Sequence, residues 1–121
     1  MNQSPIDTYH AFRNSMLAND NAWQSMLAED VKLKGPLAEI QGKEAFIAIN
    51  QPFFNSIKDS ELLEAVEQDH YVITRIITTV HTPGGGTLPM EVSEWYDIRE
   101  GKIQSLITYF DASELRKHMP S

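Results

Sequence analysis

The sequence contains no cysteine, and this absence limits the chemistry that the protein can perform. Without cysteine there is no disulfide framework, no thiolate nucleophile and no zinc site built on sulfur. The chain also lacks any apolar run that approaches the ~20 residues of a membrane-spanning helix. Residues 1–5 do not show the basic and then apolar order of a signal peptide, so we expect a cytoplasmic protein without a membrane partner.

Positive charge is scarce as well. The chain has 10 Lys and Arg residues against 17 Asp and Glu residues, which gives a formal net charge of -7. Because no basic cluster interrupts this balance, the surface should repel phosphate backbones, and nucleic acid is not expected as a partner. The 121 residues are 41% hydrophobic and 22% charged, which is typical of a globular protein. We expect a single domain, residues 1–121, with its own packed core.

The first half of the chain favours helices. Ser4-Pro5 predicts the start of a helix with apolar residues at helical spacing, and Asn19-Asp20 predicts its end. A second short helix should follow, with Trp23, Met26 and Leu27 on its buried side. A third helix is predicted from Ala45 to Ile57, with a kink at Pro52.

The second half of the chain favours strands. From residue 61 the hydrophobic spacing changes to the two-residue period of a strand, and Val31–Lys34 shows the same alternation earlier in the chain. Short, turn-rich connections predict four long antiparallel strands, over residues 61–67, 71–82, 87–99 and 102–110. This order indicates an α+β protein, and strands of this length favour a strongly bent sheet whose concave side encloses a pocket.

Several segments resemble a known family. They are Leu27-Ala28-Glu29-Asp30-Val31 running into Gly35-Pro36, then Gly42-Lys43-Glu44-Ala45-Phe46, and Gly101-Lys102-Ile103 followed by Tyr109-Phe110-Asp111. Their order and spacing resemble the nuclear transport factor 2-like superfamily and, within it, the SnoaL-like polyketide cyclases. The resemblance implies a cone-shaped fold, with helices packed on a mainly antiparallel sheet, and often a homodimer. It does not select a reaction, because the superfamily includes isomerases, cyclases, dehydratases, epoxide hydrolases and non-catalytic binders.

The resemblance can be followed residue by residue. Steroid isomerases of the superfamily use a tyrosine donor, an aspartate base and a buried protonated acid, and the matching positions here hold Phe12, Gly35 and Glu94. The carboxylate of the epoxide hydrolases falls on Thr108. The aspartate acid/base of the SnoaL-like cyclases matches Asp111. The resemblance therefore implies Glu94 and Asp111 as candidate catalytic residues.

Glu94 and Asp111 also have local explanations. Strand alternation places Glu94 on the same face as Tyr96, and burial on a concave face would raise its pKa and suit it to proton transfer. The alternative is a glutamate that faces solvent or is held by a structural hydrogen bond. Asp111 begins the sequence Asp-Ala-Ser-Glu, a capping box that predicts a terminal helix to about Lys117 without any substrate.

The pocket should be lined by core residues and by polar residues of the strands. We expect Phe12, Met16, Trp23, Phe53, Tyr96, Thr108 and Phe110 in its wall. The histidines have no metal-ligand spacing, so neither a metal nor a cofactor is expected: His10, His70, His81 and His118. Of these four residues, His81 is the one that could reach the mouth of the pocket.

We interpret the chain as a small-molecule enzyme in which Glu94 performs general acid/base catalysis on an apolar, carbonyl-bearing substrate. The alternative is a non-catalytic module of the same fold that binds an apolar ligand or only dimerises. The alternation that turns Glu94 inward turns Trp95, Ile107 and Tyr109 outward, and this apolar patch predicts a homodimer through the outer face of the sheet. A competing possibility is that residues 115–120 cover the patch within one chain.

Overall fold

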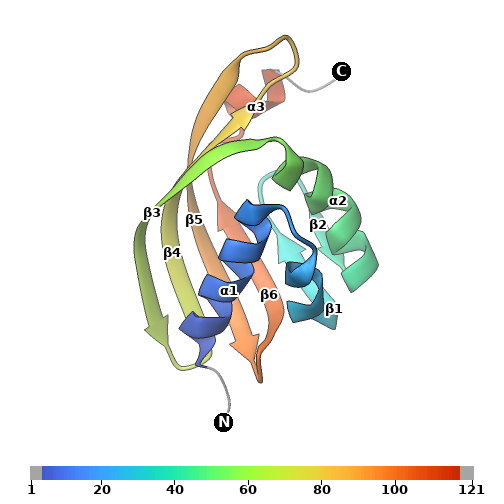
Figure 1. Cartoon of the computed structure of the whole chain (residues 1–121), viewed down its shortest axis with the longest axis vertical. Helices are drawn as coiled ribbons and strands as arrows, with labels where there is room; N and C mark the ends of the chain where they lie inside the picture. Colours follow the sequence, from blue (N-terminus) through green and yellow to red (C-terminus); the bar gives the residue numbers. More distant parts are fainter. Residues whose placement is uncertain (1–3, 118–121) are drawn as a thin grey trace.

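A computed structural model describes residues 4–117 of the chain (Figure 1). The helices are α1 (Pro5–Ala18), the short 3-10 helix η1 (Ala22–Met26), α2 (Lys43–Asn55) and α3 (Ser113–Lys117). The strands are β1 (Leu27–Lys34), β2 (Glu39–Gln41), β3 (Ile57–Gln68), β4 (Tyr71–His81), β5 (Thr87–Arg99) and β6 (Lys102–Tyr109). Within this part of the chain, no helix combines the length and the apolar character needed to cross a membrane.

The strands form one mixed sheet of six strands in the order β2-β1-β6-β5-β4-β3. Strands β3 to β6 pair antiparallel with their neighbours in sequence, as the turn-rich connections predict. β1 pairs antiparallel with β2 and parallel with β6, so the last strand joins the two parts of the sheet. Figure 1 shows α1 and α2 lying on one face of this curved sheet. The predicted α+β class, with helices on a bent and mainly antiparallel sheet, is confirmed.

Local signals set the ends of α1 correctly. The Ser4 side chain accepts a hydrogen bond from the backbone amide of Asp7, and Pro5 occupies the first turn of the helix. Asn19 ends α1 in the left-handed conformation, with a φ of 60°. The Asp20 carboxylate then accepts a hydrogen bond of 2.9 Å from the Ala22 amide at the start of η1.

The other boundaries shift where tertiary pairing competes with the local pattern. Leu27, predicted on the buried side of a helix, is the first residue of β1, and it is buried there as well. α2 ends two residues earlier than predicted, because Ser56 bonds back to the carbonyl group of Phe53. Ile57 is then free to pair with Val80, so β3 begins four residues before the predicted start. The three-residue strand β2 is too short for its sequence pattern to show, and only its pairing with β1 defines it.

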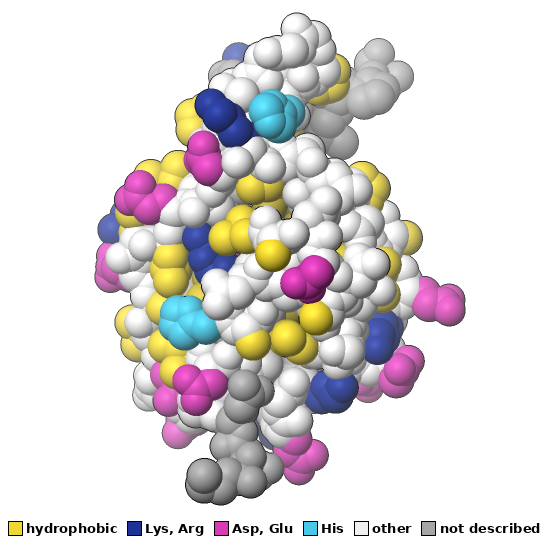
Figure 2. All heavy atoms as spheres, viewed as in Figure 1, with side chains coloured by type: hydrophobic (Ala, Val, Ile, Leu, Met, Phe, Trp, Pro, Cys, Tyr) yellow, Lys and Arg dark blue, Asp and Glu magenta, His cyan; other side chains and the backbone are white. Residues whose placement is uncertain are grey.

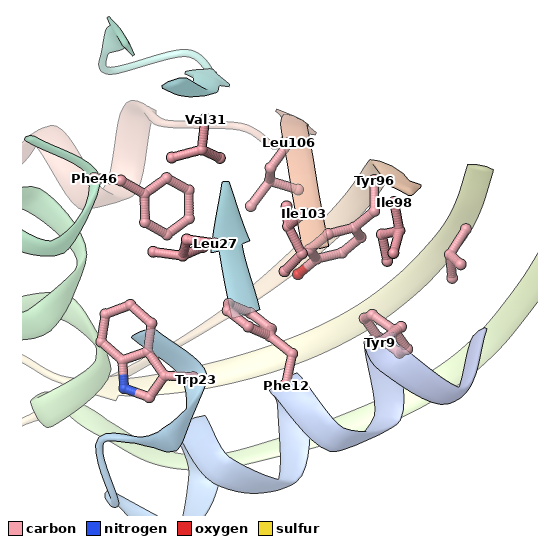
Figure 3. Packing of buried hydrophobic residues seen from close by; sticks show 11 residues of the cluster. Tyr9, Phe12, Trp23, Leu27, Val31, Phe46, Tyr96, Ile98, Ile103 and Leu106 are labelled. Carbon is pink, nitrogen blue, oxygen red and sulfur yellow. The ribbon is translucent and has the colours of Figure 1, made fainter. Parts of the chain in front are cut away.

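The main core lies between the helices and the concave face of the sheet. Figure 3 shows Tyr9 and Phe12 pointing from α1 towards the strands. The Phe12 ring packs edge-on against Trp23 and Tyr96, with ring centroids 6.1 and 6.0 Å apart. A second, smaller cluster of buried residues joins β4 and β5: Ile76, Val80, Met90 and Val92.

On the face that carries α1 and α2, Lys and Arg are few among the described residues (Figure 2). Figure 2 shows acidic side chains at many points of this face, most of them towards its edge, with small hydrophobic groups between them. This distribution agrees with the net charge of -7. A negatively charged ligand would meet an unfavourable potential on approaching this side of the molecule.

Candidate functional site

A cavity of about 300 Å³ lies between α1, α2 and the concave face of the sheet. Its wall is mostly apolar and takes residues from both hydrophobic clusters. Leu37 and Ile49 line it and are nevertheless 38% and 42% exposed, which places the mouth of the cavity beside them. Among the described residues that line the cavity, Glu94 is the only one with an acidic or basic side chain.

Six of the seven residues predicted for the pocket wall do line the cavity: Phe12, Met16, Phe53, Tyr96, Thr108 and Phe110. Trp23 does not, and its prediction as a pocket residue was wrong. It is 1% exposed and lies in the core, where its ring packs against Phe12 and, at 5.0 Å, against Phe54. Helical spacing identifies buried residues, but it cannot separate a side chain that faces a cavity from one that is enclosed by other side chains.

Glu94 is held in the cavity wall by donors from three elements. Its Oε1 accepts a hydrogen bond of 2.7 Å from the Thr74 hydroxyl on β4 and a longer one of 3.5 Å from the Tyr9 hydroxyl on α1. Its Oε2 accepts a bond of 2.9 Å from the Tyr96 hydroxyl, which lies two residues along β5 on the same face. Thr74 stands directly opposite Glu94 in the β4–β5 register. The carboxyl group therefore has a fixed orientation.

Burial favours the neutral form of each acidic group in this cluster. Desolvation raises the pKa of Glu94 above its ordinary value, although hydrogen bonds from Thr74 and Tyr96 and the charge of Arg13 lower it in part. Desolvation and the nearby Glu94 charge also raise the pKa of the Tyr9 and Tyr96 hydroxyls. The two tyrosines therefore stay protonated and act as donors. Glu94 is the group in this cluster whose charge changes as the pH rises through its raised pKa.

Arg13 is a buried cation close to this cluster. It is 8% exposed and donates hydrogen bonds of 3.1 and 3.0 Å to the hydroxyl and the carbonyl oxygen of Ser60. The Ser60 hydroxyl lies 3.0 Å from that of Thr78, a residue of the cavity wall. Glu94 therefore lies near a cation as well as apolar groups, because helix α1 turns Arg13 inward one turn after Tyr9.

Gly35 and Thr108 share one region of the cavity wall. A side chain at position 35 would collide with the Thr108 hydroxyl, so Thr108 occupies the space that an aspartate base would need. Phe12, at the position of the tyrosine donor of the steroid isomerases, likewise has no hydroxyl. The hydroxyl groups beside Glu94 come instead from Tyr9, one helical turn before Phe12, and from Tyr96.

Sequence comparison identifies the family to which this architecture belongs. Residues 7–106 match the SnoaL-like domain. The chain belongs to the SnoaL-like domain family. Among curated proteins, none matches the chain significantly.

Solved structures share the fold of this SnoaL-like chain at low sequence identity. A nuclear transport factor 2-like protein from Burkholderia pseudomallei superposes with a TM-score of 0.82 at 15% identity, over 98% of this chain and 99% of that one. A candidate isomerase from Bacillus subtilis gives 0.80 at 18% identity, over 93% and 90% of the two chains. A candidate SnoaL-like polyketide cyclase from Jannaschia sp. CCS1 gives 0.80 at 11%, over 97% and 93%. These likenesses establish the fold alone.

The structure does not bring Asp111 to the cavity of the SnoaL-like domain. Asp111 is exposed, and its Oδ1 accepts hydrogen bonds of 2.9 and 2.8 Å from the amide and the hydroxyl of Ser113. These bonds lower the pKa of Asp111, which therefore remains ionised. The capping role predicted from the sequence accounts for every hydrogen bond that the Asp111 carboxylate makes here. A catalytic role would require Asp111 to reach a substrate outside the cavity.

None of the described histidines lines the cavity, although the His10 ring lies 5.5 Å from that of Tyr9. His81 ends β4 with an exposed side chain and does not line the cavity, while His118 lies outside the described residues. Within residues 4–117, no group of three His, Asp or Glu side chains comes together as a metal site would require.

The sequence did not predict three residues that contact Glu94 or Arg13. Tyr9 and Thr74 donate hydrogen bonds to Glu94, and Ser60 accepts hydrogen bonds from Arg13. Tyr9 had a usable signal, because it lies one turn from Phe12 on the apolar side of α1. Thr74 could have been found by counting back from the hairpin at residues 82–86, which sets the register of β4 and β5. Ser60 gave no signal, because its contact with Arg13 depends on how α1 crosses β3.

Proposed function

We propose that this SnoaL-like chain is a cofactor-independent enzyme that moves a proton on an apolar, carbonyl-bearing small molecule, in an isomerisation, cyclisation or dehydration. Glu94 is the group that carries the proton. The supporting observation is a carboxyl group with a raised pKa in the wall of an apolar cavity, hydrogen-bonded by hydroxyl groups that stay neutral.

The arrangement of the cavity suits both halves of a proton transfer. The apolar body of a substrate would pack on the walls, while its oxygen would lie near Glu94 and Tyr96. When protonated, Glu94 can donate to a carbonyl or hydroxyl oxygen. When ionised, it can take a proton from the carbon next to the carbonyl. Thr74 and Tyr96 hold the carboxyl group in the same orientation in both states, so little reorganisation is needed between them.

Hydrogen exchange at carbon tests this proposal without knowledge of the natural substrate. A panel of apolar cyclic ketones is incubated in heavy water with the protein, and deuterium uptake next to the carbonyl is measured by mass spectrometry. The wild type should accelerate deuterium uptake for at least one ketone. Glu94→Gln should lower the accelerated rate by about 10²–10⁴-fold. Glu91→Gln, on the same strand but paired with Arg75 on the outer face, is the matched control. Equal rates for the wild type and Glu94→Gln would contradict the proposal.

One observation favours a binding protein as the second candidate. Glu94 is the only acidic or basic lining side chain among the described residues, so the cavity contains no second group to pair with it in a two-residue acid/base mechanism. A binder of the same fold would hold a ketone with Glu94 neutral and would release it unchanged. It would show tight binding of the ketones in the panel and no deuterium uptake above the rate in buffer.

We further propose that two copies of the chain dimerise through the outer face of the sheet. Val66, Ile73, Trp95 and Ile107 lie side by side across β3, β4, β5 and β6. Trp95 is 43% exposed and Tyr109 is 59% exposed. A two-fold interface would bury this row against its copy and leave charged groups such as Arg75 near the rim. In the described part of the chain, the C-terminal segment does not cover the row, because Leu115 lines the cavity on the opposite face.

Analytical ultracentrifugation at micromolar concentration tests the dimer. The wild type should sediment as a dimer, and Trp95→Glu should split it without changing the circular dichroism spectrum. Glu100→Lys, at the exposed β5–β6 turn, changes a charge outside the row and serves as the control. A monomeric wild type would refute the dimer.

A further inference from the structure

Two hollows of the molecule are separated by a wall of two side chains. Besides the cavity of about 300 Å³, a recess of about 240 Å³ lies between the C-terminal ends of α1 and α2 and the start of β3. Met16 and Phe54 line both hollows, and no other described residue does. The recess is more polar than the cavity, since Asn19, Asn55 and Ser60 are among its lining residues.

The two side chains of this wall differ in how firmly they are held. The Phe54 ring lies against three other aromatic rings, those of Phe12, Trp23 and Phe53, at centroid distances of 6.4, 5.0 and 6.3 Å. Any rotation of Phe54 would disturb all three contacts. Met16 is half-buried, unbranched and able to change rotamer at low cost. The Met16 side chain is therefore the part of the wall that decides whether the cavity ends there or continues into the recess.

We infer that Met16 is a specificity-determining residue that limits the length of the ligand. This inference rests on the proposed function, because it assumes that the cavity holds a small apolar molecule. With Met16 in place, the cavity takes a compact, uncharged ligand whose oxygen lies near Glu94. Without the Met16 side chain, the cavity and the recess become continuous, and the site accepts a longer ligand whose tail extends into the recess.

A homologous series of neutral fluorescent ketones measures this limit. Acyl dimethylaminonaphthalenes, from the acetyl to the lauroyl compound, carry one carbonyl group and shift their emission to the blue in apolar surroundings. Their affinities are measured for the wild type, Met16→Ala and Met26→Ala. Met26 packs against the core but lines neither hollow, so Met26→Ala removes the same atoms without changing the cavity or the recess.

The expected result is a change in the best chain length for one variant alone. Each buried methylene tightens binding about fourfold (~0.8 kcal/mol), so room for two more should favour the longer ketone about 15-fold in Met16→Ala. The wild type and Met26→Ala should share the shorter optimum. If Met16→Ala does not fold, Met16→Val removes fewer atoms and should shift the optimum in the same direction.

Three outcomes would overturn the inference, and they can be told apart. If all proteins bind the short ketones and show the same dependence on chain length, Met16 sets no limit, but the pocket function stands. If the wild type already gains affinity up to the lauroyl compound, the tail leaves through the mouth at Leu37 and Ile49 and the inference is again refuted. If no ketone binds the wild type, the proposed function itself fails, and the inference fails with it.

Discussion

The substitution Tyr96→Phe should cost more stability as the pH rises, because it removes a hydrogen bond whose acceptor changes charge. The Tyr96 hydroxyl donates to Oε2 of Glu94 at 2.9 Å. A hydrogen bond between neutral groups contributes about 0.5–1.5 kcal/mol, and one to a charged group contributes about 1.5–3 kcal/mol. Burial raises the pKa of Glu94, so Glu94 is neutral at low pH and becomes ionised as the pH rises through the raised pKa. The cost of Tyr96→Phe should therefore increase by about 1 kcal/mol across this transition.

Urea unfolding at a series of pH values measures this effect. Trp23, in the core beside Phe12, and Trp95, on the outer face, report unfolding by fluorescence. With a urea dependence of about 1–3 kcal/mol/M, a difference of 1 kcal/mol moves the midpoint by roughly 0.3–1 M, which is well within reach of the method. All proteins are compared at one concentration, since dimer formation would otherwise alter the midpoints.

Two controls decide whether Glu94 causes the effect. Introducing Tyr96→Phe into the Glu94→Gln background should give a cost that does not vary with pH, because glutamine does not titrate. Tyr71→Phe removes a hydroxyl from an exposed ring and should be nearly neutral at every pH. If Tyr96→Phe costs the same stability at low and high pH, Glu94 does not have the raised pKa on which the proposed proton transfer depends.

Four other substitutions test separate parts of the structure. Glu94→Gln should gain stability relative to the wild type as the pH rises. The wild type is stabilised by neutral Glu94 at low pH and loses this stabilisation as the pH rises through the raised pKa of Glu94. A difference in urea midpoints that does not change with pH would contradict this prediction. Asp111→Ala should lower the urea midpoint slightly through the lost cap and leave ketone affinity unchanged. Lost affinity would instead give Asp111 a role in the site. Phe46→Ala, at a fully buried position, should cost about 3–5 kcal/mol in urea unfolding. Gly35→Ala should lower the free energy of unfolding by about 1–3 kcal/mol, because the new side chain collides with Thr108. Adding Thr108→Ala should restore most of this stability. If stability is not restored, the collision with Thr108 is not the cause of the loss.

Local geometry explains why much of the sheet could be predicted from the sequence. Successive side chains of a strand point to opposite faces whatever the strand pairs with. The alternation of β5 therefore placed Glu94 and Tyr96 on one face and Trp95 on the other before any contact was known, and in the structure the face of Glu94 and Tyr96 is the one that lines the cavity. The cap at Asp111 is equally local, since its donors belong to Ser113, two residues further along the chain.

The charge environment of Glu94 could not be predicted in the same way. Tyr9 reaches Glu94 across 85 positions of sequence, and Arg13 meets Ser60 across 47. Neither pair has a spacing that marks it, because the angle at which α1 crosses the sheet decides which side chains of the helix meet which strand. Burial raises the pKa of Glu94. Two groups that partly lower this pKa, Arg13 and Tyr9, are brought close to Glu94 by the angle at which α1 crosses the sheet.

The sequence by itself determined the class of the fold and which residues of a strand share a face, and it made Glu94 one of two candidate carboxyl groups. Those properties depend on backbone periods and on turns that a few neighbouring residues encode. Only the tertiary structure decided that β6 pairs in parallel with β1, that Trp23 is enclosed while Met16 borders open space, and which hydroxyl groups surround Glu94. Each of these depends on packing between segments that are distant in sequence, so no local pattern of residues could specify it.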